Sequence, residues 1–245
     1  MSSVQVIIDR QLRRWEMEKA ARASQPAREQ AGPPLQPVIT VSRQRGSGGS
    51  RIAELVARRF DYTLLHRDVI DRICTSSNIR RSIVESLDEH AKSQLATWCD
   101  AMVSQRYTDS ADYVRLLLET IRSVAALGGV VVVGRGSNFI VGPDQGLHVR
   151  IVAPREQRIR RLVEHARLSP RDAAREVETS EHDRAEFIRK VYGRNIADPE
   201  GYDLVVNTGA ITFEEAVDLV AAAARAKFER LRREAGSASA GARAG

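Results

Sequence analysis

The stretch that decides the fold is residues 38–60, VITVSRQRGSGGSRIAELVARRF. Its β-branched opening, 38–41, predicts a strand, and the glycines and serines of 46–50 predict a tight turn. Beyond the turn, apolar residues from Ile52 to Phe60 recur at helical spacing and predict a helix with one apolar face. A strand, a glycine-rich turn and a helix in this order are typical of a phosphate-binding loop.

The phosphate-binding template G-x-x-x-x-G-K-[ST] is half kept here. Its glycines fall on Arg43 and Gly48, its lysine on Gly49 and its Ser/Thr on Ser50. The remaining glycines still allow the backbone to turn its N–H groups inward at a helix N-terminus, where an anion is favoured. The alternative is a glycine turn that only joins strand to helix. We predict that the Ser50 hydroxyl contacts Mg²⁺ and that nucleotide phosphates bind Gly46, Ser47, Gly48, Gly49, Ser50 and Arg51.

Because the lysine is absent, another cation is needed at the outer phosphates. Arg43, Arg45 and Arg51 flank the glycines. Arg51 falls in the first helical turn, from which a long side chain can fold back over phosphate, and Arg43 leaves the strand beside the nucleotide. Arg45 is at the loop apex and is predicted to face water. We therefore predict that Arg43 or Arg51 replaces the lysine, since a guanidinium can bind phosphate through two hydrogen bonds.

Composition limits the class of protein. The 245 residues are 42% apolar, which suits a globular domain with a buried core, and the net charge is +6. That excess suits anionic ligands such as nucleotides, whereas aromatic residues are only 5% and no basic run carries stacking aromatics, so nucleic acid is not favoured. No apolar run is long enough to span a bilayer. The two cysteines have no metal-ligand spacing and indicate reduced thiols of a cytoplasmic protein.

The chain is predicted to contain a central α/β domain with appendages. An amphipathic helix at 1–24, a candidate surface for homo-oligomer formation, and a proline-rich linker at 25–37 precede a domain at 38–233. Low-complexity composition predicts a disordered tail at 234–245. Strands are predicted at 38–41, 63–65, 130–133, 147–153 and 203–207. Helices alternate with them, which predicts a doubly wound, parallel five-stranded sheet with a helical insertion at 76–127.

Four segments resemble, in order, the cytidylate kinase-like family, a divergent branch of the P-loop nucleoside monophosphate kinases. They are ITVSRQRGSGGSRIAELVARRFDYTLLHRDVIDRI, VVVVGRGSNFIV, LHVRIVAPREQRIRRLVE and DRAEFIRKVYGRNIADPEGYDLVVNTGAITFEEAVDLV. The resemblance covers roughly residues 38–222. It implies ATP binding with Mg²⁺ and phosphoryl transfer to a nucleoside monophosphate, such as cytidylate, or a similar small acceptor. It also implies that the turn NTG at 207–209 borders the adenine site.

In monophosphate kinases a mobile lid supplies arginines, and the matching region here is 170–194. Arg184 lies in the middle of an apolar stripe of that predicted helix, and a buried arginine needs an anion. A phosphate would serve, and so would Glu181, one turn away. Arg189 and Arg194 lie further round the helix and suit solvated charges, but family position adds Arg189 to the catalytic candidates.

Two further residues are candidates for acceptor binding. The strand VVVV ends in Gly134 rather than in an acid that would organise Mg²⁺. Arg135, which follows, could hold an acceptor phosphate at the carboxyl end of the sheet, or cap a helix or pair with an acid. Asp68 matches the acidic residue that the family has near the start of the next helix. It is a candidate for metal or acceptor contact, or a helix N-cap.

Two other classes of function compete with a kinase. A nucleotide-binding sensor or pseudokinase would keep the anion site and lose the chemistry, in keeping with the missing lysine and acid. An interaction protein would use its basic helices to bind RNA or a partner. Turnover with an acceptor, nucleotide binding without turnover, and retention on RNA would separate the three.

Overall fold

The computed structural model describes residues 37–85, 87 and 111–241, together with positions 6–7, 9–10, 13–14, 16–17 and 20. Much of the predicted N-terminal helix, all but the last residue of the linker and residues 88–110 of the predicted insertion lie outside these described residues. The chain divides into two compact units. One comprises residues 38–64 and 131–225, and the other comprises 1–37, 65–130 and 226–245.

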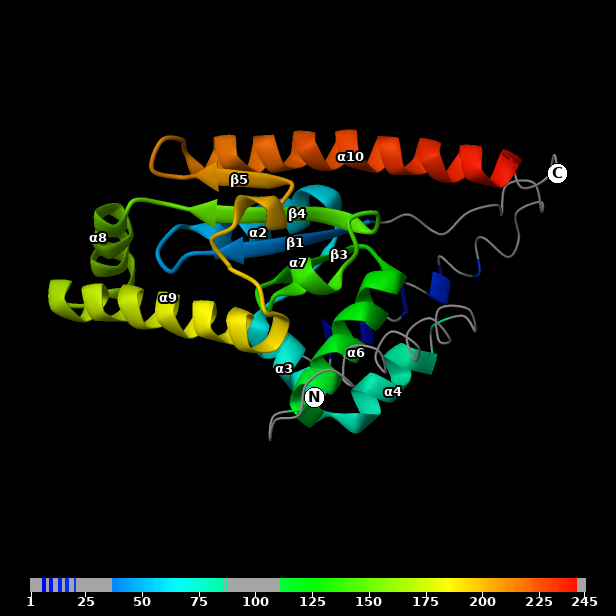
Figure 1. Ribbon diagram of the computed structural model, residues 1–245, viewed down its shortest axis with the longest axis horizontal. Helices are drawn as coiled ribbons and strands as arrows, with labels where there is room; N and C mark the ends of the chain where they lie inside the picture. The colour runs from blue at the N-terminus through cyan, green and yellow to red at the C-terminus, as the bar shows by residue number, and fades with distance from the viewer. Residues whose placement is uncertain are drawn as a thin grey trace. The chain divides into compact units, whose positions relative to one another are not determined.

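Five strands form one parallel sheet in the order β2-β3-β1-β4-β5. Their bounds are β1 Val38–Arg43, β2 Thr63–Leu65, β3 Val130–Val133, β4 Gly146–Val152 and β5 Leu204–Asn207. In Figure 1 the arrows of β1 and β4 run side by side in the same direction. β1 pairs with β3 at Ile39↔Val131 and with β4 at Ile39↔Leu147. The predicted α/β class and all five predicted strands are confirmed.

β-branched residues explain the central strands. All four valines of β3 are buried, as are the first five residues of β1, so both faces of these strands are covered. Side chains alternate between the two faces of the sheet. Arg43 and Ile151 therefore face α2 (Gly49–Phe60), which they approach at Gly49, whereas Ser42 contacts Tyr202 on the opposite face.

Two helices follow β4 and pack on each other (Figure 1). They are α8, Arg155–Ala166, and α9, Pro170–Tyr192. α9 begins after Ser169, whose side chain accepts a hydrogen bond from the amide of Asp172, and proline opens the helix. Between β3 and β4 lies the short α7, Ser137–Ile140, and the 3-10 turn Pro199–Gly201 precedes β5.

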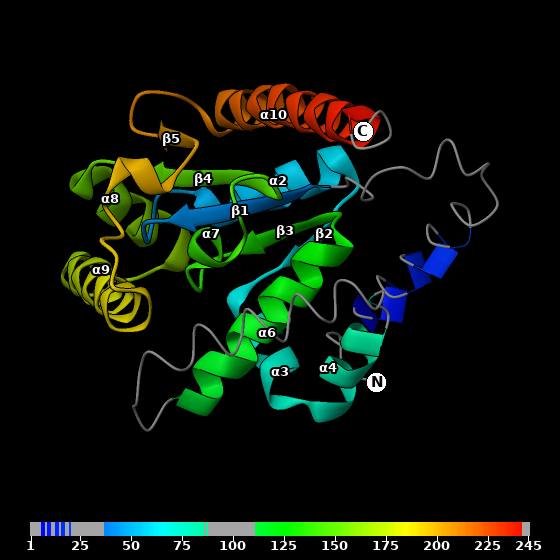
Figure 2. The same ribbon diagram turned by 45° about the vertical axis from the view of Figure 1, so that its right-hand side comes forward.

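The other unit contains α3 (Arg67–Thr75), α4 (Ser77–Glu85) and α6 (Ala111–Leu127), the last two within the range predicted for the insertion. α3 and α6 lie side by side in Figure 2 and are joined by a 2.8 Å hydrogen bond from Tyr113 to Asp71. No helix among the described residues is long and apolar enough to cross a membrane.

The last helix, α10, runs from Phe213 to Gly241. It starts at a capping box formed by Thr212 and Glu215. It continues into the segment for which composition predicts disorder. Alanine is the strongest helix former, and extending an existing helix avoids the cost of starting one, which accounts for the longer helix.

Candidate functional site

The glycine loop, residues 44–48, leads from β1 into α2 and curves at two glycines. Gly46 and Gly48 both have a φ of 80°, in the left-handed region that glycine adopts at little cost. Gly48 is also the N-cap of α2. The turn is closed by the carbonyl of Gln44, which accepts hydrogen bonds from the Ser47 amide at 3.3 Å and from the Ser47 hydroxyl at 2.9 Å. The fully buried Ser47 side chain therefore supports the turn.

Several backbone amides of this loop are available to a ligand. Within the part of the chain that the structure describes, the amides of Gly46, Gly48, Ser50 and Arg51 donate no hydrogen bond. The amide of Gly49 makes only a long one, 3.4 Å, to the Ser47 hydroxyl. These groups surround the N-terminus of α2, where the helix dipole is positive. The loop thus has both the donors and the field of an anion site.

The outer side of the loop is held by the turn after β5. The Thr208 hydroxyl donates a 2.7 Å hydrogen bond to the carbonyl of Ser47, and Arg161 donates one of 2.7 Å to the carbonyl of Thr208. The Arg161 guanidinium lies over the ring of Phe213, 5.0 Å from its centroid, and burial lowers the pKa of this arginine. The Phe213 ring is packed so closely on Gly48 that a Cβ atom there would overlap it.

The sequence indicated the turn at 207–209 but gave no sign of Arg161 or Phe213. Neither belongs to a motif, and α8 and α10 carry many arginines and apolar residues at similar spacing. The resemblance placed this turn at the edge of a nucleotide site. The position of this turn is therefore the one signal that could have pointed to Arg161 and Phe213.

A closed ring of side-chain contacts ties the other side of the loop to α8 and α9. The Gln44 amide donates to Glu181 at 2.8 Å and accepts from the backbone of Ala153 at 3.0 Å. Glu181 forms a 2.9 Å ion pair with Arg158, and Arg158 donates a 2.9 Å hydrogen bond to the carbonyl of Ala153. The Arg158 side chain is only 5% exposed, so Glu181 serves as counter-ion to a buried charge.

The three arginines of the loop region have different surroundings. Arg51 pairs with Glu54 at 2.8 Å and is 53% exposed, so its side chain lies along the surface of α2. Arg45 hydrogen-bonds Glu176 of α9 at 2.7 Å and is 42% exposed. Arg43 is only partly exposed and packs against the start of α2.

Arg184 reaches the end of β1, where its guanidinium donates a 2.8 Å hydrogen bond to the carbonyl of Arg43. Glu181, the alternative partner that helical spacing suggested, binds Gln44 and Arg158. The structure thus brings the predicted Arg184 to the glycine loop.

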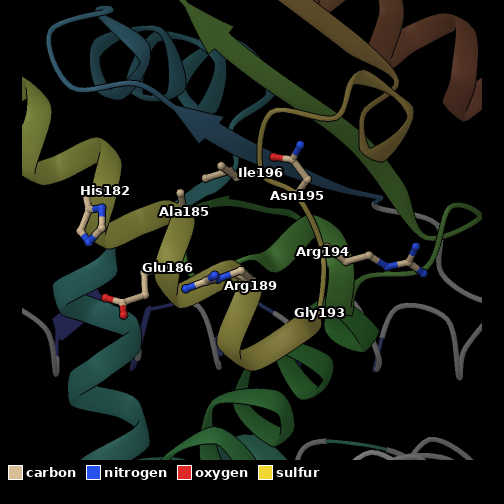
Figure 3. Close-up of a pocket in the computed structure, with 8 residues that line it drawn as sticks. All are labelled: His182, Ala185, Glu186, Arg189, Gly193, Arg194, Asn195 and Ile196. Carbon is tan, nitrogen blue, oxygen red and sulfur yellow. The ribbon is translucent and has the colours of Figure 1, made fainter.

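Figure 3 shows a pocket of about 510 Å³ on a second stripe of α9 and on the turn that follows it. It is lined by His182, Ala185, Glu186, Arg189, Gly193, Arg194, Asn195 and Ile196. Sequence spacing suggested solvated surface charges for Arg189 and Arg194, and both residues are exposed where they border this pocket. The pocket lies where Gly193 ends α9 in the left-handed conformation and the chain turns back.

The charge of the pocket is partly fixed by a neighbour. Lys190 forms a 2.7 Å ion pair with Glu186, and its hydrogen bond and charge lower the pKa of this carboxyl. Glu186 is therefore ionised at neutral pH. Arg189 and Arg194 also line the pocket, but their guanidiniums point in opposite directions in Figure 3, so each could bind an anion only separately.

Arg135 lies at the carboxyl end of β3 with a φ of 55°. Its guanidinium is 5.5 Å from the ring centroid of Phe187, and its carbonyl accepts a 2.6 Å hydrogen bond from the Tyr192 hydroxyl. Asp68 belongs to the other unit and lies, exposed, in the first turn of α3. The N-cap of that helix is His66, so the N-cap alternative for Asp68 is wrong.

The residues present fit a magnesium ion held mainly by a nucleotide. Ser50 is exposed in the first turn of α2, beside the available amides, and its hydroxyl is a suitable ligand. Mg²⁺ keeps several waters and takes phosphate oxygens, so one protein ligand is compatible with it. In the described part of the chain no three His, Cys, Asp or Glu side chains gather as a metal cluster.

Comparison with known proteins gives the family. A 97-residue stretch is 37% identical to uronate isomerase of Corynebacterium glutamicum, but it spans only 19% of that protein. Cytidylate kinase of Ignicoccus hospitalis is 27% identical over 183 residues, covering 75% of this chain and 96% of that one. An uncharacterized protein from Eubacterium ventriosum shares the fold, with a TM-score of 0.59, 18% identity, and coverage of 76% of this chain and 96% of that chain. The model of the cytidylate kinase-like family matches residues 38–210, so the chain belongs to the cytidylate kinase-like family.

Proposed function

We propose that this protein transfers the γ-phosphoryl group of ATP to a nucleoside monophosphate, such as cytidylate, or to a similar small phosphate acceptor. The observation that carries the proposal is the set of available amides on the glycine loop at the N-terminus of α2. Phosphoryl transfer needs positive charge and alignment rather than covalent catalysis, and such a loop supplies both. Family membership and the cytidylate kinase relative support the choice of acceptor.

In this proposal the glycine loop and Arg51 bind the phosphates of ATP through backbone amides, and the Ser50 hydroxyl is a ligand of Mg²⁺. The ion would neutralise phosphate charge. Arg184 acts on the transferred group from its position at the Arg43 carbonyl. Arg43 and Arg51 are the candidates to replace the lysine.

The acceptor is assigned to the pocket on α9. Arg189 provides a guanidinium for its phosphate, while Asn195 and the ionised Glu186 can accept hydrogen bonds from the rest of the molecule. Arg135 and Asp68 are further candidates for acceptor contact. Because Lys190 pairs with Glu186, the remaining arginine charge makes a phosphate monoester a better ligand than an uncharged sugar.

A second function, a nucleotide sensor without catalysis, is favoured by one specific observation. The two positions that carry the lysine and the acid in P-loop kinases are both glycine, Gly49 and Gly134. Such a protein would bind ATP on the same loop and release it unchanged.

A screen with ATP and Mg²⁺ across nucleoside monophosphates and small phosphorylated metabolites tests the proposal, with ADP release and the phosphorylated product both measured. Turnover is expected with at least one monophosphate, and calorimetry should show ATP binding without acceptor. The variant Glu178→Gln, on an exposed part of α9, serves as a control expected to match the wild type. ATP binding without turnover on any acceptor would favour the sensor, and absence of ATP binding would contradict both functions.

A further inference from the structure

The side chain of Arg43 packs against two glycines from different parts of the chain. A Cβ atom built on Gly49 would lie 2.5 Å from the Cβ of Arg43 and 3.1 Å from its Cγ. A Cβ atom on Gly134, at the end of β3, would overlap the guanidinium of the same arginine. Arg43 thus extends from the start of α2 to the carboxyl end of the neighbouring strand, through space that a side chain at 49 or 134 would occupy.

These residues are the three places where the chain departs from a P-loop kinase. The template has glycine where this chain has Arg43, and lysine where it has Gly49. An acid would end β3 where Gly134 stands. The departures at 43 and 49 are reciprocal, since one position gains a long cationic side chain and the other loses one. The two positions are in direct contact.

We propose that Arg43 performs the task of the loop lysine, and that Gly49 is a glycine because Arg43 occupies the space beside it. Gly134 leaves room for the same side chain, and its φ of 83° favours glycine in addition. This inference rests on the proposed function, because it assumes that ATP phosphates lie on the glycine loop. It assigns Arg43 as a catalytic residue that binds the transferred phosphoryl group from the sheet side of the loop. In this view the glycines at 49 and 134 leave space for the Arg43 side chain, and they do not indicate that activity has been lost.

The surroundings of the other loop arginines favour Arg43. Arg51 is paired with Glu54 and largely exposed, and Arg45 is paired with Glu176. Arg43 is half-buried, its Nε atom is buried, and its carbonyl is the acceptor for Arg184. Two arginines, one from β1 and one from α9, therefore meet at the end of the central strand. A cation that is shielded from water acts on phosphate more strongly than an exposed one.

The transfer itself requires charge stabilisation but no protein base when the acceptor is an ionised phosphate. An acceptor oxygen forms the new bond to the γ-phosphorus while the bond from that phosphorus to the bridging oxygen breaks. The bridging oxygen keeps the electron pair and leaves on ADP. Arg43 moves no proton. Its guanidinium binds the oxygens on which negative charge accumulates, through one or two hydrogen bonds.

The sharpest test exchanges the two residues. Arg43→Gly should lower turnover roughly 10²–10³-fold, as expected for loss of a charge that stabilises a transition state. Gly49→Lys should not raise activity and should lower the Tm, because its Cβ would overlap Arg43.

The double variant restores both template positions and removes the overlap. Its turnover should be at least roughly tenfold higher than that of Arg43→Gly. Two substitutions at independent sites would not show such a coupling. Arg58→Gln, on the exposed surface of α2, is the control expected to match the wild type.

The contact between Arg43 and Gly49 can also be tested without measuring activity. Gly49→Ala should lower the Tm of the wild type, and it should lower the Tm less in the Arg43→Gly background. Equal shifts in both backgrounds would overturn the packing argument. A double variant that recovers neither ATP affinity nor turnover would overturn the role of Arg43.

The outcomes also separate this inference from the proposed function. If the wild type binds ATP but never turns over, the kinase proposal fails. The ATP affinities of Arg43→Gly, Gly49→Lys and the double variant then still decide whether Arg43 replaces the lysine. If the wild type binds no ATP, both fail.

Discussion

The carboxylate of Glu181 accepts a 2.8 Å hydrogen bond from the side-chain amide of Gln44, which binds α9 to the first residue of the glycine loop. The same carboxylate is the counter-ion of the buried Arg158. Arg184 lies one turn further along α9 and contacts the carbonyl of Arg43. Arg184 is therefore held by a contact beside the loop that it is proposed to serve.

Replacing Glu181 should affect both stability and turnover. Glu181→Gln leaves the buried Arg158 without its counter-ion, and loss of this charged hydrogen-bond partner should cost about 1.5–3 kcal/mol of unfolding free energy. Because Glu181 also holds Gln44, the residue next to the carbonyl that Arg184 contacts, a shift of the loop should lower turnover by up to about 10²-fold, as misplacement of a catalytic group by about 1 Å can do. Urea unfolding and steady-state kinetics measure the two effects.

Glu178→Gln provides the matched control, since Glu178 pairs with Arg155 on the exposed side of the same helix. The combination Arg158→Met with Glu181→Leu removes both charges and should keep the fold stable while still releasing Gln44. Wild-type turnover in that stable double variant would show that the tie to Gln44 does not position Arg184.

Arg184 should matter for the reaction more than for binding. Arg184→Ala should lower kcat roughly 10²–10³-fold, with a much smaller effect on the Kd of ATP, because its charge is needed where negative charge develops. Arg184→Lys should recover only part of the loss, since an ammonium cannot make the two parallel hydrogen bonds of a guanidinium. Kinetics and calorimetry separate the two parameters. An unchanged kcat in Arg184→Ala would mean that this arginine is structural.

The strands and caps could be predicted because their signals are local. A few neighbouring residues are enough to predict the valine strand β3, the N-cap at Ser169 and the capping box of Thr212 and Glu215. Helical periodicity also placed Arg184 on the inner stripe of α9. The identity of its contact was beyond such reasoning, because Arg43 is 141 positions away in sequence. Periodicity gives the side of a helix, whereas the partner depends on the packing of distant segments.

The pocket illustrates the same limit. Arg189 and Arg194 fall outside the buried stripe, and helical spacing assigns both to solvent, where the structure also has them. That they border one pocket depends on the turn at Gly193, whose geometry cannot be derived from a helical wheel. The exchange between Arg43 and Gly49 was visible in the sequence as two separate departures from a template. Their contact, seen only in three dimensions, joins them into one.

Gly48 should tolerate no side chain. Its φ of 80° costs an alanine about 1–2 kcal/mol, and the new methyl group would point at the ring of Phe213. Gly48→Ala should therefore lower the Tm and weaken ATP binding, because the loop must move to relieve the contact. Thermal unfolding and calorimetry measure both. Adding Phe213→Ala should remove the steric part of the loss and leave the backbone part. No relief in the double variant would mean that Phe213 does not set the conformation of the loop.

The capping box of α10 should make stability depend on pH. The Thr212 amide donates a 2.7 Å hydrogen bond to Glu215, and the Glu215 amide donates one of 3.2 Å to the Thr212 hydroxyl. The hydrogen bonds from the backbone and then the side chain of Thr212 hold the pKa of Glu215 below its ordinary value. A carboxyl whose pKa is lower in the folded state stabilises the fold above its unfolded pKa, and this stabilisation is lost as the pH falls through the folded pKa.

Glu215→Gln should therefore lower the Tm most at neutral pH and progressively less under acid conditions. Thermal unfolding followed by circular dichroism between about pH 7 and about pH 3, a range that contains the ordinary glutamate pKa, measures the difference from wild type. Glu214→Gln is the matched control, since Glu214 is exposed in the same first turn and should leave the pH profile unchanged. A Tm difference that stays constant from neutral to acid pH would show that the ionised form of Glu215 does not stabilise the start of α10.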